Sequence, residues 1–321
     1  MKAFRSILIA LLMAPLAALG QAYPSKAVRM VVPYAAGGAT DTVARAMGNR
    51  LSEALGQPVV IDNRAGANGT IGADIVAKAA ADGYTLVLTG GPPHAAYPFL
   101  TKNVPFDTVK DFTPIIIIGT APQVLVVHPS LPATSVKGLI DYAKKNPGKL
   151  SFGTPGVGTG PHMGGLLLNR AAGIDMVHVA YKGGAPALND VLGGQIPVAI
   201  LVLSTAMPHA RSGKLRMLGV LDPQRAKAAP DTPTIAEAGV PGFAVPDQWI
   251  GVFGPANLSA AIVNQLNVAV LKAVAFPDVR SRLEAVGFEI KGNTAKASAD
   301  HVVKDYETYR KITTELGIKP E

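Results

Sequence analysis

Residues 32–41 have the sequence Val32-Pro33-Tyr34-Ala35-Ala36-Gly37-Gly38-Ala39-Thr40-Asp41 and connect a predicted strand to a predicted helix. The strand is the apolar run 28–33, and the helix follows from apolar side chains that recur every four residues between 43 and 55. The two glycines let the backbone pass close to a ligand, and Thr40 or Asp41 can cap the helix. Because the first N–H groups of a helix have no acceptor within it, this junction can bind an anion. An ordinary tight turn is the alternative interpretation.

A second junction of the same kind lies at residues 152–162, with the sequence Phe152-Gly153-Thr154-Pro155-Gly156-Val157-Gly158-Thr159-Gly160-Pro161-His162. Thr159 or Gly160 suits the cap of the following helix, and Pro161 suits its first turn. Two such helix starts, one from each half of the chain, can face each other across a cleft. We therefore expect them to hold a small carboxylate from both sides.

Short apolar runs alternate with helical patterns along the rest of the chain, which is typical of an α/β protein with parallel sheets. Further strands are predicted at 59–61, 85–88, 115–118, 124–127, 150–152, 177–180, 198–203, 215–221 and 249–253. Further helices are predicted at 71–80, 139–144, 162–172, 186–192, 260–275, 278–286 and 295–316.

Two consecutive strands with Pro122 between them, 115–118 and 124–127, indicate where the chain crosses into a second domain. The proline-rich stretch 222–245 is interpreted as loop and return linker. The expected architecture has two lobes joined by two hinge strands, with lobe 1 formed by 23–121 and 245–321 and lobe 2 by 122–244.

The first 22 residues are predicted to be a secretory signal peptide. Lys2 and Arg5 precede an apolar stretch from Ser6 to Leu19, and Gly20-Gln21-Ala22 places small residues around a cleavage site after Ala22. A membrane anchor is the alternative, but this stretch spans only about 21 Å as a helix, against a hydrocarbon core of about 30 Å. The mature chain is therefore expected to be exported.

Composition excludes several classes of protein. The chain has 321 residues and no cysteine, which excludes a disulfide scaffold, a thiolate metal site, a cysteine enzyme and a lipoprotein. The formal net charge is +8, but the cations are scattered and no basic run with interleaved aromatic residues occurs. No nucleic-acid partner is therefore expected.

Catalytic motifs are missing from the sequence. It contains no G-x-S-x-G, no H-E-x-x-H and no complete phosphate-binding loop. We therefore expect a protein that is not an enzyme, with neither a metal nor a cofactor.

Two other strand ends are weaker candidates for the site. Thr89 and Gly90 follow the strand 85–88 and can line the cleft or form a plain loop. Tyr181 and Lys182 follow the strand 177–180, and Lys182 can pair with a second carboxylate of a ligand or remain solvated.

In its sequence strings the chain resembles the Bug-type substrate-binding proteins of tripartite tricarboxylate transporters. The resemblance covers nearly the whole mature chain and rests on strings that occur in the family's order. These are Tyr23-Pro24-Ser25-Lys26, Val32-Pro33-Tyr34 with Gly37-Gly38-x-x-Asp41-x-x-Ala44-Arg45, Leu55-Gly56-Gln57-Pro58-Val59-Val60, Asn63-Arg64-x-Gly66-Ala67, Asp82-Gly83-Tyr84-Thr85-Leu86, Asp111-Phe112-x-Pro114, Lys144-x-Asn146-Pro147-Gly148-Lys149-Leu150, His178-Val179-x-Tyr181-Lys182-Gly183 and Glu237-Ala238-Gly239.

The resemblance implies a two-lobed periplasmic binding protein of the type II, Venus-flytrap kind. Such a protein captures a small organic carboxylate and delivers it to the membrane permease subunits of the transporter, and we expect it to act as a monomer. An extracytoplasmic sensor that docks a signalling partner is the alternative, since both roles use the same lobes.

The family's two ligand loops fall on residues 34–41 and 154–162. The residues expected to bind the ligand are Tyr34, Ala36, Gly37, Gly38, Thr40, Asp41, Thr89, Gly90, Thr154, Pro155, Gly158, Thr159, Gly160, His162, Tyr181 and Lys182. The chain departs from the family pattern at Ala35-Ala36, at Gly90-Gly91-Pro92-Pro93 and at Pro155. These departures remove side-chain donors near the distal end of a ligand.

Overall fold

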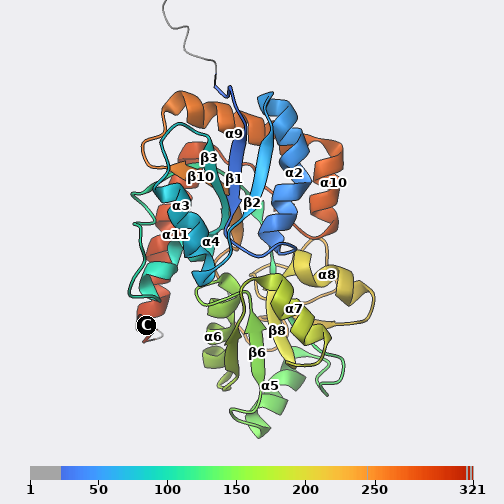
Figure 1. Cartoon of the computed structure of the whole chain (residues 1–321). Coiled ribbons are helices and arrows are strands. Elements are labelled where there is room, and N and C mark those ends of the chain that lie inside the picture. Colours follow the sequence, from blue (N-terminus) through green and yellow to red (C-terminus); the bar gives the residue numbers. More distant parts are fainter. Residues whose placement is uncertain (1–22, 244, 316, 319, 321) are drawn as a thin grey trace, which may run out of the picture.

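The computed structural model describes residues 23–243, 245–315, 317, 318 and 320, and the predicted signal peptide lies outside this range. The described chain forms two lobes, one above the other in Figure 1, each built around its own sheet. A six-stranded sheet has the order β11-β4-β10-β3-β1-β2, and a five-stranded sheet has the order β7-β6-β8-β5-β9. The two-lobed α/β fold expected from the sequence is confirmed.

The first lobe takes its elements from both ends of the described chain. They are β1 Val28–Val32, α2 Ala39–Leu55, β2 Val59–Asn63, η1 Ala67–Gly69, α3 Thr70–Ala77, β3 Thr85–Gly90, α4 Gly91–Ala95, η2 Tyr97–Phe99, β4 Phe112–Thr120, β10 Trp249–Pro255, α9 Ala260–Ala275, α10 Pro277–Ala285, β11 Glu289–Ile290 and α11 Ala295–Glu315. One face of the sheet packs on α2, α9 and α10, and the other packs on α3 and α11. Because both faces are covered, Ile115–Ile118 in β4 are all buried and show no alternation.

The second lobe is formed by the middle of the chain. Its elements are β5 Gln123–Val127, α5 Val136–Lys145, β6 Ser151–Thr154, α6 Gly160–Ala172, β7 Val177–Ala180, α7 Gly184–Leu192, β8 Val198–Val202, α8 Leu203–Arg211 and β9 Arg216–Val220. Its sheet is also covered twice, by α5 and α6 on one face and by α7 and α8 on the other.

Both sheets are mixed rather than purely parallel, which corrects the sequence-based prediction. β1, β2 and β3 are parallel, but β10 runs antiparallel to β3 and β4. In the second sheet β6, β7 and β8 are parallel, while β5 runs antiparallel to β8 and β9. Two of the exceptions, β10 and β5, are the strands by which the chain enters a lobe from the other one, and such a strand has no crossover helix to orient it. The third, β11, is a two-residue strand that pairs antiparallel with β4 at the edge of the first sheet.

The chain crosses between the lobes at Ala121-Pro122, after β4, and returns before β10. The two crossings touch each other, because the amide of Ala121 donates to the main-chain oxygen of Gln248 at 2.7 Å. Val245 still packs in the core of the second lobe. The residues at which the lobes divide stay a prediction.

A small apolar cluster joins the lobes on another side. Tyr309 in α11 and Leu100 in the first lobe belong to one cluster with Met163 in α6, and Ile312 packs against it.

Among the described residues no single helix has the length and apolar composition to cross a membrane. α9 and α10 meet those conditions only as a pair, and they are bent by 74° relative to each other.

Candidate functional site

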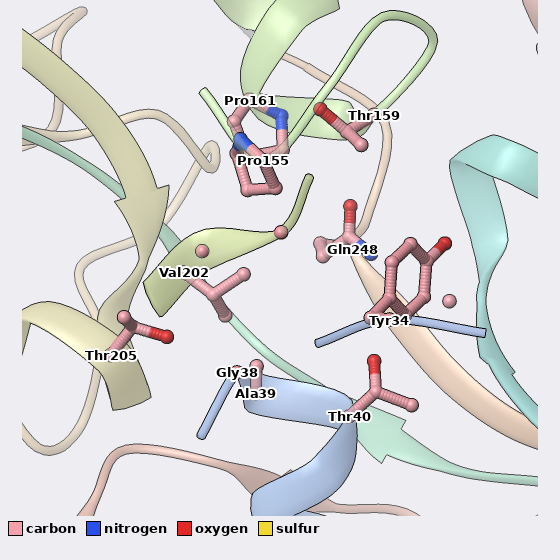
Figure 2. A pocket seen from close by; sticks show the side chains of 13 residues that line it. Tyr34, Gly38, Ala39, Thr40, Pro155, Thr159, Pro161, Val202, Thr205 and Gln248 are labelled. Atoms are coloured by element: carbon pink, nitrogen blue, oxygen red, sulfur yellow. The ribbon is translucent and has the colours of Figure 1, made fainter. Parts of the chain in front are cut away.

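One pocket lies where the two predicted glycine junctions meet, and it holds about 470 Å³ of space between protein atoms, part of it open to solvent. Thirteen residues line it, and none of these described residues carries a carboxylate, ammonium, guanidinium or imidazole side chain. They are Tyr34, Gly38, Ala39, Thr40, Gly90, Pro155, Thr159, Pro161, Gly183, Gly184, Val202, Thr205 and Gln248. Figure 2 shows the wall of Pro155, Thr159 and Pro161 opposite the wall of Gly38, Ala39 and Thr40.

The first junction places the start of α2 at the pocket, but it is capped differently from the prediction. Gly38 is the N-cap residue and makes no side-chain cap hydrogen bond. Neither Thr40 nor Asp41 caps the helix. Instead, the Asp41 carboxylate turns back and accepts the amide N–H of Gly37 at 2.9 Å. A side chain three residues inside the helix thus holds the turn before it.

Asp41 is the centre of a network that fixes this junction. Its carboxylate also accepts hydrogen bonds from Arg45 at 2.9 Å and from Nδ2 of Asn63 at 3.0 Å. The same Nδ2 donates to the main-chain oxygen of Tyr34 at 3.1 Å. Burial acts to raise the pKa of the Asp41 carboxyl, but the hydrogen bonds from Arg45, Gly37 and Asn63 outweigh it and hold the pKa below its usual value. Asp41 is therefore charged, and Arg45 compensates that charge.

The second junction is closed by its own hydrogen bonds. Of the two predicted candidates, Thr159 and not Gly160 caps α6, and its hydroxyl accepts the amide of His162 at 3.4 Å. The same hydroxyl donates to the oxygen of Gly156 at 2.7 Å. The amide of Gly158 donates to Nδ1 of His162 at 3.2 Å. These bonds fix the loop that carries Pro155 and Thr159 to the pocket.

Two imidazoles, those of His162 and His178, make hydrogen bonds with residues of this loop. The ring centroids of His162 and His178 lie 4.1 Å apart with the rings tilted by 32°, and Nε2 of His178 lies 2.7 Å from the hydroxyl of Thr154. Burial lowers the pKa of His162 to about 3, with a smaller contribution from His178, and burial lowers the pKa of His178 to about 4. Both rings are neutral at neutral pH, which the bond to Nδ1 of His162 requires.

Two further helices begin at the pocket, and neither start was among the predicted site residues. α7 begins at Gly184, and both Gly183 and Gly184 line the pocket. α8 begins at Leu203, and Val202 and Thr205 line the pocket beside it. The starts of α2, α6, α7 and α8 therefore converge on one space. The Gly183-Gly184 pair after a strand is the sequence signal that could have revealed the start of α7. The start of α8 gave no such signal, because this helix has no side-chain cap hydrogen bond and contains Pro208.

The two lobes touch at the edge of the pocket. A Cβ built on Gly183 would lie 3.6 Å from both the Cβ and the amide nitrogen of Ala35, and one built on Gly38 would lie 4.0 Å from the amide nitrogen of Gly184. Gly183 has φ +122°, which side-chain-bearing residues rarely adopt. The approach of the lobes here is thus between main chains.

The predicted ligand residues fall into two groups. Those that line the pocket are Tyr34, Gly38, Thr40, Gly90, Pro155 and Thr159. Those that are not among its lining residues are Ala36, Gly37, Asp41, Thr89, Thr154, Gly158, Gly160, His162, Tyr181 and Lys182. Lys182 is exposed, and the hydroxyl of Tyr181 donates to Asp190 at 2.6 Å. Sequence reasoning missed Ala39, Pro161, Gly183, Gly184, Val202, Thr205 and Gln248. Contact of any of these residues with a ligand stays a prediction.

Comparison with known proteins places this chain in a family. Residues 43–318 match the tripartite tricarboxylate transporter family receptor. The chain belongs to this family. It is a periplasmic solute-binding protein with the two-lobed fold, and its family and structural neighbours are binding proteins rather than enzymes.

Three solved structures of this kind are similar over nearly the whole chain. A protein of R. palustris solved with adipate is 36% identical, with a TM-score of 0.89, over 93% of this chain and 100% of the other. The periplasmic binding protein BugD is 32% identical, with a TM-score of 0.88, over 93% and 100%. MatC from Rhodopseudomonas palustris with bound malate is 33% identical, with a TM-score of 0.86, over 90% and 99%.

Proposed function

We propose that this binding protein captures a small organic carboxylate between its lobes. The observation that carries the proposal is the convergence of α2, α6, α7 and α8 on one pocket whose lining contains no charged side chain. Main-chain N–H groups at helix starts then supply the attraction for an anion, each terminus contributing about 0.3–1 kcal/mol and up to about 2 when partly buried. The adipate and malate of the two R. palustris neighbours support this ligand class.

The predicted ligand residues that line the pocket are proposed to contact the ligand. Several of the predicted residues that do not line it are proposed to hold the lining residues in place. Asp41, Gly158, Thr154 and His162 bond to the two junctions rather than to the pocket, so we assign them a positioning role. Closure of the lobes about the two crossings would complete the site, since each lobe contributes only part of the lining.

The protein is proposed to act in the periplasm after cleavage behind Ala22 and to deliver its ligand, as a monomer, to the permease subunits of a tripartite transporter. Mass spectrometry of protein from the periplasm tests the cleavage site. Co-purification with membrane proteins separates transport from sensing: a permease partner is expected, and a signalling partner would contradict delivery.

Thermal unfolding in the presence of small carboxylates tests capture itself. A ligand that binds only the native state raises the free energy of unfolding by RT ln(1 + [L]/Kd), and the melting temperature rises with it. Carboxylates are expected to raise it while the corresponding amides, which lack the charge, do not. Equal shifts with acids and amides would contradict the proposal.

A further inference from the structure

Gln248 lies in the return crossing and brings one polar side chain into the pocket. It is 8% exposed and lines the pocket, and Figure 2 shows its amide beside Tyr34, across the space from Val202 and Thr205. Its Oε1 accepts no hydrogen bond from any residue in the described part of the chain. A buried oxygen acceptor without a donor costs about 1–3 kcal/mol, so a donor from a ligand would be favourable here.

The surroundings of Gln248 keep space for this amide. A Cβ built on Gly90 would lie 2.7 Å from Nε2 of Gln248, and one built on Gly160 would collide with its Oε1. Two glycines from different lobes therefore leave room for a single side chain. This arrangement fixes the amide between the end of β3 and the start of α6.

A second glutamine, Gln123, brings another amide oxygen without a donor to the start of α6. Gln123 begins β5 in the outgoing crossing and is fully buried. Its Oε1 likewise has no donor among the described residues, and its Nε2 makes only a long hydrogen bond of 3.4 Å to Pro246. A Cβ on Gly160 would lie 3.0 Å from its amide atoms as well. Both crossings thus direct amides to the start of α6.

We propose that Gln248 is a specificity residue that accepts a hydrogen bond from an uncharged donor on the ligand, so that the pocket selects a small monocarboxylate bearing a hydroxyl group. This inference rests on the proposed capture of a carboxylate. A second carboxylate would bring another acceptor to the unpaired Oε1 of Gln248 and meet no cation in the lining, and an ammonium would meet no carboxylate. The ligand body would lie against Pro155, Pro161 and Val202.

Two matched series of acids test the inference. The four-carbon series is butyrate, 4-hydroxybutyrate, 4-aminobutyrate and succinate, and the six-carbon series is hexanoate, 6-hydroxyhexanoate, 6-aminohexanoate and adipate. Isothermal titration gives Kd for each acid with the wild-type protein, with Gln248→Met and Gln248→Glu, and with the control Gln195→Met, which changes an exposed glutamine.

The wild-type protein should bind one hydroxy acid at least about tenfold more tightly than the methyl-terminated acid of its length, because an unpaired buried acceptor penalises the acid without the donor. Gln248→Met should reduce that ratio of Kd values to within about twofold. Gln248→Glu should shift the preference to the amino-substituted acid of the same length. Gln195→Met should match the wild type.

Two outcomes would overturn the inference and leave capture intact. In the first, a dicarboxylate binds most tightly, and in the second, the preference for the hydroxyl survives both substitutions of Gln248. If no acid of either series binds, carboxylate capture itself is contradicted.

Discussion

The main-chain oxygen of Gln248 accepts the amide N–H of Ala121 at 2.7 Å, so the two segments that connect the lobes are bonded to each other beside the pocket. Ala121 follows the last strand residue before the chain leaves the first lobe, and Gln248 precedes the strand by which it returns. The side chain of Gln248 enters the pocket from this same point. A ligand that contacts it therefore contacts the connection between the lobes.

Asp41→Ala should loosen the first junction and weaken carboxylate binding. The substitution removes the acceptor of the Gly37 amide and the partner of Arg45 and Asn63. The expected loss of stability is about 1–3 kcal/mol, with at least about a tenfold rise in Kd. Urea unfolding and titration with carboxylates measure the two effects.

Asp141→Ala is the control for Asp41, since Asp141 forms an exposed pair with Lys137. Such pairs contribute about 0–1 kcal/mol, so both readouts should stay near the wild type. Unchanged affinity in Asp41→Ala would show that this network does not position the ligand loop.

Gly160→Ala should disturb the pocket even though alanine is the better helix former. The added Cβ would collide with Oε1 of Gln248 at the start of α6. Gly48→Ala in α2 is the matched control, because its Cβ would meet only Ile61 at 3.8 Å. Replacing a helical glycine by alanine stabilises by about 0.5–1 kcal/mol where space allows. We expect that gain in Gly48→Ala alone, and weaker ligand binding in Gly160→Ala alone.

Thr205→Val tests whether α8 belongs to the site. The Thr205 side chain lines the pocket and is 8% exposed, so loss of its hydroxyl should raise the Kd for carboxylates about tenfold if it bonds to the ligand. Ser204→Ala is the neighbouring control, since Ser204 is not among the lining residues. Equal affinities of the two variants would remove α8 from the site.

The pair of His162 and His178 should make the protein sensitive to acid. Their pKa values, about 3 and about 4, lie below the ordinary value near 6.5, so the native state binds fewer protons than the unfolded state between these limits. Their contribution to stability is complete above about pH 6.5 and is lost as the pH falls towards 4. Urea midpoints between pH 7 and pH 4.5 should therefore fall less steeply for His178→Asn than for the wild type, and identical slopes would contradict this.

Much of this fold could be predicted from local patterns, because glycine junctions and apolar spacing are local properties. The start of α6 is an example: Thr159 and Pro161 are cap and first-turn residues by type, and they occupy those places. The antiparallel directions of β10 and β5 could not be predicted, since they depend on how the chain passes between the lobes.

The residues that line the pocket were predicted only where they follow the same local signals. Gly38 and Thr40 line the pocket because they start a helix after a strand. The prediction that Asp41 could cap this helix was wrong, because its carboxylate accepts from the turn before the helix. Gln248 gave no signal, since it comes to the pocket only through the return crossing, more than 80 residues beyond Thr159.

A crystal structure of the protein grown with a tightly bound carboxylate tests the central claim most directly. We expect the carboxylate oxygens within hydrogen-bond distance of the amides of Ala39 or Thr40 in the first lobe, with a further contact from the second lobe at α6, α7 or α8. An acid bound to one lobe alone, or held by a lysine or arginine outside this pocket, would contradict the account.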